Sequence, residues 1–301
     1  MSSDVAQTLL SAVSTLMSKL FGGLPIPIHS GSLHAFAGTV RASKSVDMSV
    51  DAANKSVCAT SAFDGVASQY DRQWTDAPIG LAQRELVWRF VDPLFHTGDR
   101  ILDVGCGTGA DAAHLSRRGA IVHATDPSPA MIEIARERGG FTTAVLPAEQ
   151  IASVGGIFDG AISNFGALNC LDDLASFARA LATRVRPGGY VAICTIGKFC
   201  LWEFLYYTTH GKFAKGLRRL RGTAPSSLGV TVRYPSIVAL REAFEDFQLV
   251  RWTGIGLFVP PSYVRMRGGI VRWCSFLDRA LARLPLLRAL ADHRLLILVR
   301  K

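Results

Sequence analysis

The sequence predicts an α/β fold, in which a seven-stranded, mostly parallel sheet carries helices on both faces. Three observations lead to this prediction. Strand-like and helix-like segments alternate from residue 80 to residue 196. A glycine-rich turn follows the first predicted strand directly. Hydrophobic residues make up 49% of the 301 residues and charged residues only 19%, so a large core can form and global disorder is excluded.

The first half of the predicted sheet contains three strands, at residues 100–104, 121–125 and 142–146, with helices at 110–118 and 128–138 between them. Before them, residues 80–95 show helical spacing of apolar side chains, which places on one stripe Leu81, Leu86, Val87, Phe90 and Val91. Helices between successive strands favour parallel pairing, because a parallel connection has to return to the opposite edge of the sheet.

The second half contains strands at 158–163 and 190–196, with a helix at 171–183, and then the alternation stops. Residues 198–220 are aromatic, basic and helical in pattern. A helix at 236–244, a strand at 247–254, one or two helices at 269–291 interrupted at Pro285, and an apolar strand at 295–299 complete the chain. We therefore expect helical insertions at 197–235, after the fifth strand, and at 259–293, between the sixth and seventh.

These boundaries indicate one domain over residues 61–301. Residues 1–60 are rich in Ser, Ala and Gly and poor in acids, which predicts a flexible extension. No apolar run reaches the roughly 18–20 residues that span a bilayer, so a cytoplasmic protein is expected. The six cysteines form no CxxC pair and show no metal-ligand spacing, which favours reduced thiols and no bound metal.

Charge is distributed unevenly along the chain. Residues 197–301 contain 18 of the 33 Lys and Arg residues but only 6 of the 24 acids, whereas residues 61–196 carry a net charge of −4. A basic C-terminal third indicates an acidic small molecule, an anionic membrane surface or nucleic acid as a partner. The alternative is a set of solvated arginines on helix surfaces.

The glycine turn has the spacing of a nucleoside site. Gly105 and Gly107 allow close approach of backbone to a ligand, and Gly109 allows the following helix to pack tightly on the strand. Asp103 places a carboxylate at the carboxyl edge of the sheet, and Asp126 ends the next strand, where an acid can accept both hydroxyls of a ribose. A carboxylate beside the loop would repel a pyrophosphate but suits an ammonium group.

Residues 101–109, with the sequence Ile-Leu-Asp-Val-Gly-Cys-Gly-Thr-Gly, closely resemble the first motif of class I S-adenosylmethionine-dependent methyltransferases. The resemblance extends over residues 63–196. It implies a Rossmann-like fold, a methyltransferase activity, S-adenosyl-L-methionine as the methyl donor and S-adenosyl-L-homocysteine as the product.

The same resemblance implies roles for individual residues at the donor. Asp103 would order the loop and meet the methionine amino group, while Gly105, Cys106, Gly107 and Gly109 form the loop that lines the methionine part. Asp126 would hold the ribose.

The adenine and methyl ends of the donor have their own implied residues. Pro127 and Met131 would flank the adenine, and Ala148 or Glu149 would meet its amino group. Asn164 and Phe165 would lie beside the reactive methyl. Tyr70 would cover the donor from a segment that precedes the core, with Trp74 and Arg84 as further candidates.

The acceptor is less defined. Residues 164–167 read Asn-Phe-Gly-Ala and lack the Pro-Pro-aromatic run of many amide- and base-nitrogen methyltransferases, so an oxygen or carbon acceptor on a small molecule is expected. The aromatic and basic stretch 198–221 suits a cap over a hydrophobic acceptor that bears an acid, or else a core-packed helix with a solvated basic end. Glu203, Tyr206 and His210 are candidate bases or structural residues, so the catalytic residue stays open.

Residues 260–293 combine an apolar with a basic stripe. The first contains Leu277, Leu281, Leu284, Leu287 and Leu290, and the second Arg272, Arg279, Arg283 and Arg288. Packing on the sheet or on another subunit explains this pattern, and so does peripheral contact with an anionic membrane. Two other functions stay open: an RNA methyltransferase that uses the basic third, although no RNA-binding module is recognisable and nucleic acid is not expected, and a catalytically inactive S-adenosylmethionine-binding protein. The sequence does not define the oligomeric state.

Overall fold

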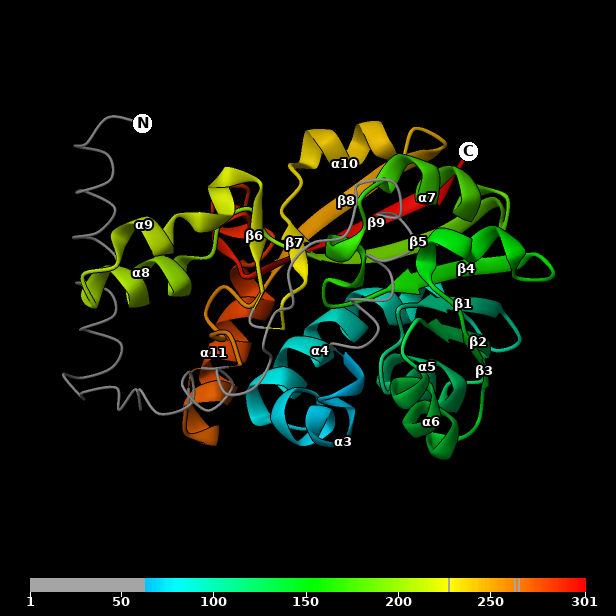
Figure 1. Cartoon of the computed structure of the whole chain (residues 1–301), viewed down its shortest axis with the longest axis horizontal. Coiled ribbons are helices and arrows are strands. Elements are labelled where there is room, and N and C mark those ends of the chain that lie inside the picture. Colours follow the sequence, from blue (N-terminus) through cyan, green and yellow to red (C-terminus); the bar gives the residue numbers. More distant parts are fainter. Residues whose placement is uncertain (1–62, 227, 263, 265) are drawn as a thin grey trace, which may run out of the picture. The chain divides into compact units, whose positions relative to one another are not determined.

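A computed structural model describes residues 63–226, 228–262, 264 and 266–301, and it confirms the predicted fold (Figure 1). The extension predicted at 1–60 lies outside the described residues. Seven strands form one sheet in the order β3-β2-β1-β4-β5-β9-β8. They are β1 (Arg100–Val104), β2 (Ile121–Asp126), β3 (Thr142–Val145), β4 (Phe158–Ser163), β5 (Val185–Ile196), β8 (Phe247–Ile255) and β9 (His293–Arg300).

Strands β1 to β5 pair in parallel, and β9 runs antiparallel to both β5 and β8. The carboxyl ends of β1, β2, β4 and β5 therefore meet at one edge of the sheet. Because β9 runs in the opposite direction, its first residue, His293, lies at the same edge, opposite Ile196 at the end of β5. Residues that lie far apart in the sequence thus meet at the edge where open α/β sheets bind ligands.

One face of the sheet is covered by α4 (Pro78–Val91) and α5 (Ala110–Arg117), whose apolar side chains pack on the odd-numbered residues of β1 and β9. Four members of the stripe predicted at 80–95 are buried, but Leu81 is 41% exposed, so its placement on that stripe was wrong. Helix α11 (Gly268–Leu281) packs against α4 (Figure 1). Helix α6 (Pro129–Arg138) contacts β2 and β3.

The opposite face carries α7 (Leu174–Ala182), α10 (Ile237–Ala243) and the short helix η4 (Ala148–Ser153). Helix α7 begins three residues later than predicted, because the side chain of Asp173 accepts a hydrogen bond from the Ser176 amide and so caps the helix there. Ser236 caps α10 in the same way, through the amide of Ala239.

The insertion after β5 was predicted to be one helical stretch over residues 198–220, but it contains several short elements. It forms α8 (Leu201–Thr209), α9 (Phe213–Gly216), the 3-10 turn η6 (Arg218–Arg221) and a small hairpin of β6 (Thr223–Pro225) and β7 (Thr231–Arg233). Gly211, at φ +70°, separates the two helices. The Asn169 side chain amide donates to the carbonyls of Ile196 and Arg233, which fixes the hairpin beside the sheet edge.

Short elements complete the described chain. They are α3 (Ala67–Tyr70), the π-helix η2 (Asp71–Thr75), and the 3-10 helices η3 (Asp92–Leu94), η5 (Ala167–Cys170) and η7 (Leu287–Leu290). The break predicted near Pro285 is confirmed, since α11 ends at Leu281 and η7 follows it. None of the helices in the described part of the chain is long and apolar enough to span a bilayer.

Candidate functional site

The glycine turn folds as the motif requires. Gly105, Gly107 and Gly109 have φ values of +70°, +54° and +77°, which residues with a Cβ rarely adopt. The amides of Gly105 and Cys106 donate to the Thr125 carbonyl at 2.8 and 2.9 Å, so the turn is held to the end of β2. A Cβ at Gly107 would meet no heavy atom within 4 Å. The loop therefore has open space beside Gly107, where a ligand can approach the backbone.

Gly109 allows close packing of neighbouring helices. A Cβ there would lie 2.9 Å from Ala135 Cβ of α6 and 2.7 Å from the Phe141 ring. The absence of a side chain thus lets α6 approach the start of α5, and its role in packing α5 on the strand stays a prediction.

Asp126 is buried at the end of β2 and its carboxylate is oriented by two backbone amides. Oδ2 accepts from Gly107 N and Oδ1 from Ser128 N, both at 2.9 Å. Burial raises the pKa of Asp126 to about 6, although the same two hydrogen bonds oppose the rise. The carboxylate is thereby fixed between the glycine loop and the start of α6. A ribose whose two hydroxyls donate to this carboxylate would have to lie there.

Asp103 is 1% exposed, and its Oδ2 is buried without a hydrogen-bond partner. Burial is the main cause that raises the pKa of Asp103 well above 3.8, and the neighbouring carboxylate of Asp111 raises it further while Arg84 opposes. An unpaired buried carboxyl oxygen is costly unless a ligand completes it. The ammonium group of a bound donor would supply that missing partner.

Asp111 connects several site residues and was missed in the sequence. Trp88 Nε1 donates to Asp111 Oδ1 at 2.7 Å, Asn164 Nδ2 donates to Oδ2 at 3.0 Å, and Arg84 forms an ion pair with it. The one available signal was an acid two residues after Gly109, on a helix expected to be buried. Asp111 orients Asn164, and it engages the Arg84 side chain that was a candidate for contact with the donor.

Phe165 follows Asn164 at the carboxyl end of β4, with φ +48°. The guanidinium of Arg84 lies over its ring at 4.8 Å, and the ring meets the His293 imidazole edge-on at 5.3 Å. A non-glycine residue in the left-handed region is uncommon and tends to occur at functional sites. The end of β4, the predicted place of the reactive methyl, thus contacts a histidine from β9.

A segment before the sheet closes over the glycine loop. Asp71 accepts from Thr108 Oγ1 at 2.6 Å and pairs with Arg138, whose Nε donates to the Thr108 carbonyl. Asp64 accepts from the Ser128 hydroxyl and the Ala130 amide at the start of α6. Residues 63–76 therefore connect to both the loop and the turn after Asp126. The π-helix η2 lies within this segment, a form that often marks functional sites.

Tyr70 lies on this segment, packed against the Trp74 ring at 5.0 Å and in one apolar cluster with Val66, Ala67 and Met131. Burial raises the pKa of Tyr70, so the phenol is neutral. Met131 is 1% exposed, and Pro127 is half-buried. The residues predicted at the lid and at the adenine thus meet beside Asp126.

The other predicted donor residues lie at the same edge of the sheet. Leu146 N donates to the Asp126 carbonyl at 3.0 Å, which brings the turn with Ala148 and Glu149 beside the end of β2. Ala148 is half-buried at the start of η4, whereas Glu149 is exposed. Burial raises the pKa of the Cys106 thiol, whose Sγ lies 3.4 Å from the Gly107 carbonyl oxygen, so the thiol is neutral.

Of the candidate bases, Glu203 is structural. It is 1% exposed and bound to Arg219, whose Nε donates to it at 2.8 Å and whose Nη2 also reaches Asp292 at 2.8 Å. His210 is exposed at the end of α8 and contacts the Tyr206 ring at 4.4 Å. The network of Glu203, Arg219 and Asp292 holds the insertion to the start of β9.

His293, which contacts Phe165 at the end of β4, was missed in the sequence. Its side chain is 13% exposed, and Nδ1 lies 3.4 Å from Asp292 Oδ2, buried and without a hydrogen bond. The exposed part of the side chain therefore lies on atoms other than Nδ1. Burial lowers the pKa of His293, opposed by Asp292 and reinforced by Arg219. No sequence motif marks it, because only the antiparallel course of β9 brings it to this edge.

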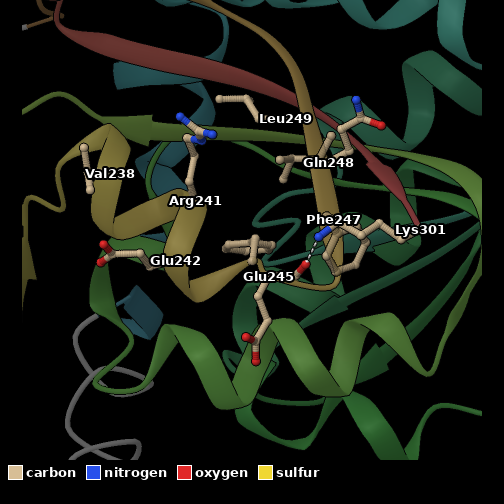
Figure 2. Close-up of a pocket in the computed structure, with 10 residues that line it drawn as sticks. Val238, Arg241, Glu242, Glu245, Phe247, Gln248, Leu249 and Lys301 are labelled. Atoms are coloured by element: carbon tan, nitrogen blue, oxygen red, sulfur yellow. Dashed lines mark hydrogen bonds between the residues drawn. The ribbon is translucent and has the colours of Figure 1, made fainter.

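A hollow elsewhere on the surface is not part of this site. Figure 2 shows it between α10 and the edge strand β8, with Arg241, Glu242, Phe247 and Lys301 among its lining residues. None of the predicted donor residues lines it. Within the described ranges, no three His, Cys, Asp or Glu side chains cluster as metal ligands.

The family described as "Methyltransferase domain" matches residues 70–253. The chain belongs to the class I S-adenosylmethionine-dependent methyltransferases. The predicted fold, the family and the methyl donor that this family uses are thereby confirmed. A Mesorhizobium loti S-adenosylmethionine-dependent methyltransferase structure has a TM-score of 0.52 at 20% identity, covering 71% of this chain and 98% of that one.

Other relatives are enzymes with named reactions. A ubiquinone biosynthesis O-methyltransferase of Methylocella silvestris is 38% identical over 34% of this chain and 41% of its own length. A demethylmenaquinone methyltransferase of Clavibacter sepedonicus is 33% identical over 49% and 61%. The chain thus spans about half the length of these relatives. A Burkholderia thailandensis 1,6-didemethyltoxoflavin-N1-methyltransferase, solved with its acceptor and S-adenosylhomocysteine, shares the fold at TM-score 0.54 and 17% identity, covering 85% and 93%.

Proposed function

We propose that this protein transfers the methyl group of S-adenosylmethionine to an oxygen or carbon of a small hydrophobic molecule. The observation that supports it most is the unpaired buried Oδ2 of Asp103, at the same edge of the sheet as the oriented carboxylate of Asp126. The two carboxylates suit the ammonium and ribose ends of one donor, and the open space at Gly107 suits the part between them.

The residues around the loop fit the remaining parts of the donor. Met131 and Pro127 would enclose the adenine, the turn at Ala148 and Glu149 would meet its amino group, and Tyr70 would cover it. Asn164 would lie beside the sulfonium, held by Asp111. S-adenosylmethionine supplies an activated methyl group, so the protein mainly has to position the acceptor and exclude water.

The acceptor side is apolar, which supports a hydrophobic acceptor. Phe165 lies half-buried at the end of β4, and its ring meets the His293 imidazole edge-on. The relatives named for ubiquinone and demethylmenaquinone reactions support the same class of acceptor. We therefore propose a phenol or quinol ring with an apolar substituent.

His293 would accept the acceptor's proton. The acceptor oxygen or carbon forms a bond to the methyl carbon while the carbon–sulfur bond breaks, and the electron pair of that bond neutralises the sulfonium. The displaced proton passes to Nε2 of His293, and the Asp292 carboxylate at 3.4 Å from Nδ1 stabilises the imidazolium. The lowered pKa of His293 keeps the imidazole neutral before the reaction.

Two measurements test the function. Calorimetry should show S-adenosylmethionine binding that Asp126→Ala weakens about 100-fold, because two charge-assisted hydrogen bonds are lost, whereas the exposed Glu242→Ala on α10 leaves it unchanged. Label from methyl-labelled donor should appear in a short-chain demethylmenaquinol or in a quinol precursor. Absence of donor binding would refute the function, while binding without transfer to any metabolite of an extract would indicate an inactive binding protein.

His293 is tested separately. His293→Asn should lower kcat at least tenfold without changing donor affinity, and the rise of rate with pH through the histidine pKa should disappear. The matched control is His210→Asn, which removes an exposed histidine of α8. An unchanged pH profile in His293→Asn would exclude His293 as the proton acceptor.

An RNA substrate has less support, because much of the basic C-terminal third is used within the fold. Arg219 and Arg294 are buried, Arg288 lies over the Trp252 ring at 3.9 Å, and Arg233 pairs with Asp172. Salt-sensitive retention of tRNA by the protein would favour that alternative.

A further inference from the structure

Helix α11 has one buried and one exposed face. Val271, Cys274 and Asp278 point into the domain. On the opposite face Trp273 is 71% exposed and Phe276 60%, with their ring centroids 6.2 Å apart. Adjacent exposed aromatic side chains on one helix face are unusual at a surface that contacts only water.

The turn after α11 extends this apolar surface. Leu286 is 84% exposed and Leu284 47%, whereas Leu277, Leu281, Leu287 and Leu290 are half-buried. The leucine stripe predicted from the sequence thus mostly packs inward, and a different set of side chains remains exposed. We call this set the α11 surface: Trp273, Phe276, Leu284 and Leu286.

The charges around the α11 surface are positive. Arg267, Arg272, Arg279 and Arg283 are all exposed, with the Arg283 guanidinium also over the Phe90 ring at 4.7 Å. The only acid in residues 266–291 is Asp278, which is buried. Arg279 pairs at 3.7 Å with Glu85 of α4, an exposed contact that competes weakly with other anions. The α11 surface is therefore apolar in its centre and cationic at its border.

We propose that the α11 surface docks on an anionic lipid bilayer, with Trp273, Phe276 and the two leucines in the interface and the arginines at the headgroups. Trp and Phe beside Arg on one helix face match the two contributions to interfacial binding, apolar burial and attraction to anionic lipid. A second copy of the chain is a poorer occupant, since a two-fold contact would place the same arginines opposite each other.

The buried face of α11 connects this surface to the acceptor side of the site. Asp278 accepts hydrogen bonds from the amides of Leu257, Phe258 and Val259 at 2.8 to 3.1 Å. The Leu257 carbonyl in turn accepts from Trp202 of α8 at 3.0 Å, and the Pro260 carbonyl accepts from Gln83 of α4 at 3.1 Å. One loop thus joins α11 to α8 and to α4, the helix whose Arg84 lies over the Phe165 ring. Docking through the α11 surface would bring the site close to an apolar acceptor dissolved in the bilayer. That consequence rests on the proposed function, whereas docking itself does not.

Sedimentation of the full chain with vesicles tests the docking. The protein should bind 7:3 phosphatidylcholine:phosphatidylglycerol vesicles and bind pure phosphatidylcholine much more weakly, with binding to the anionic vesicles reduced by salt. The double variant Trp273→Ser/Phe276→Ser should bind at least tenfold more weakly. Each of Arg272→Gln, Arg279→Gln and Arg283→Gln should weaken binding about fivefold at low salt.

Helix α10 provides matched controls on the other side of the sheet. Val238 is 62% exposed and Arg241 is exposed, and both lie on α10 (Figure 2). Val238→Ser and Arg241→Gln should leave vesicle binding unchanged. Circular dichroism and donor binding by calorimetry on each variant show whether it is folded.

Two results would overturn the proposal: no binding to the anionic vesicles, or equal losses in the α10 variants. A dimer that dissociates in Trp273→Ser/Phe276→Ser, without vesicle binding, would assign the α11 surface to a second copy. Vesicle binding by a protein that transfers no methyl group would leave the docking standing and refute the proposed function instead.

Discussion

The glycine-loop region and the insertion after β5 differ in how their buried acids are satisfied. Around the glycine loop, Asp103 retains an unpaired buried oxygen, and the pKa values of Asp103 and Asp126 are raised by burial. In the insertion after β5 and at the start of β9, Arg219 binds Glu203 and Asp292. On α11, Asp278 accepts hydrogen bonds from three backbone amides.

This difference indicates where each region obtains its binding energy. The unsatisfied oxygen of Asp103 costs stability in the free protein, and a cationic ligand that pairs with it would restore that stability on binding. Paired charges stabilise one arrangement of the insertion and leave little polar capacity for a ligand. Under the proposed function, the acceptor would therefore be recognised by apolar and aromatic contact, with His293 as the polar exception.

The largest test of the comparison removes the central cation of the paired network. Burial alone would lower the pKa of Arg219, but Asp292 and Glu203 raise it, so the guanidinium stays charged. Arg219→Ala leaves the buried Asp292 carboxylate without its arginine, and leaves Glu203 with Arg218 alone, so it should reduce the free energy of unfolding by about 3–5 kcal/mol. Urea denaturation measures it. Arg186→Ala, which breaks the exposed pair with Asp159, should cost less than about 1 kcal/mol.

Removal of a buried charge beside the glycine loop should change stability little and donor affinity strongly. Asp103→Asn eliminates an unpaired buried carboxylate, so the unfolding free energy should not fall by more than about 1 kcal/mol. S-adenosylmethionine affinity should fall about 10- to 100-fold, because the donor's ammonium loses its charged partner. A large loss of unfolding free energy in Asp103→Asn, together with an unchanged donor affinity, would contradict the proposed contrast.

A smaller effect is expected from pH. The pKa of Asp126 is raised to about 6, so its carboxylate is ionised at pH 7.5 and mostly protonated at pH 5. Under the proposed function the ionised form of Asp126 accepts the ribose hydroxyls, so donor affinity should fall as pH decreases through 6, by up to about tenfold per pH unit. Asp103, whose pKa is also raised, acts in the same direction. In Asp126→Asn, calorimetry at pH 5.5 and 7.5 should show a weaker dependence.

The smallest effect concerns the segment that closes on the loop. Arg138→Ala removes the partly exposed pair with Asp71 and should weaken donor and product binding about threefold, through a faster dissociation rate. Stopped-flow displacement of S-adenosylhomocysteine measures that rate. Arg136→Ala, an exposed change on the same helix, is the control, and equal effects of the two variants would exclude a specific role for the contact.

The strands could be predicted because their signals are local. Strand β4 occupies the predicted residues, and β1 as well, since each is a continuous apolar run bounded by turn residues. Strand β5 begins at Val185 rather than residue 190, because Val185 pairs with Phe158 across a register shift that no local pattern encodes. The hairpin β6–β7 has strands of three residues each and depends on Asn169, so its residues alone carry no sign of it.

The candidate site divides in the same way. The loop, Asp103 and Asp126 are predicted by spacing within 24 residues of chain. Asp111 and His293 are defined only by neighbours far away in sequence: Asp111 by Arg84, Trp88 and Asn164, and His293 by Phe165. An antiparallel strand that returns to the carboxyl edge cannot be aligned with the others from a single sequence.

The contacts of Asp64 and Asp71 also determine where the working unit begins. The family match starts at residue 70, but Asp64 already holds the turn at Ser128 and Ala130. A fragment that starts at residue 77 would contain every strand of the sheet and every glycine of the loop, yet it would lose the anchors of Thr108, Arg138 and Ser128. Dissection of this protein should therefore keep residue 63 and all that follows it.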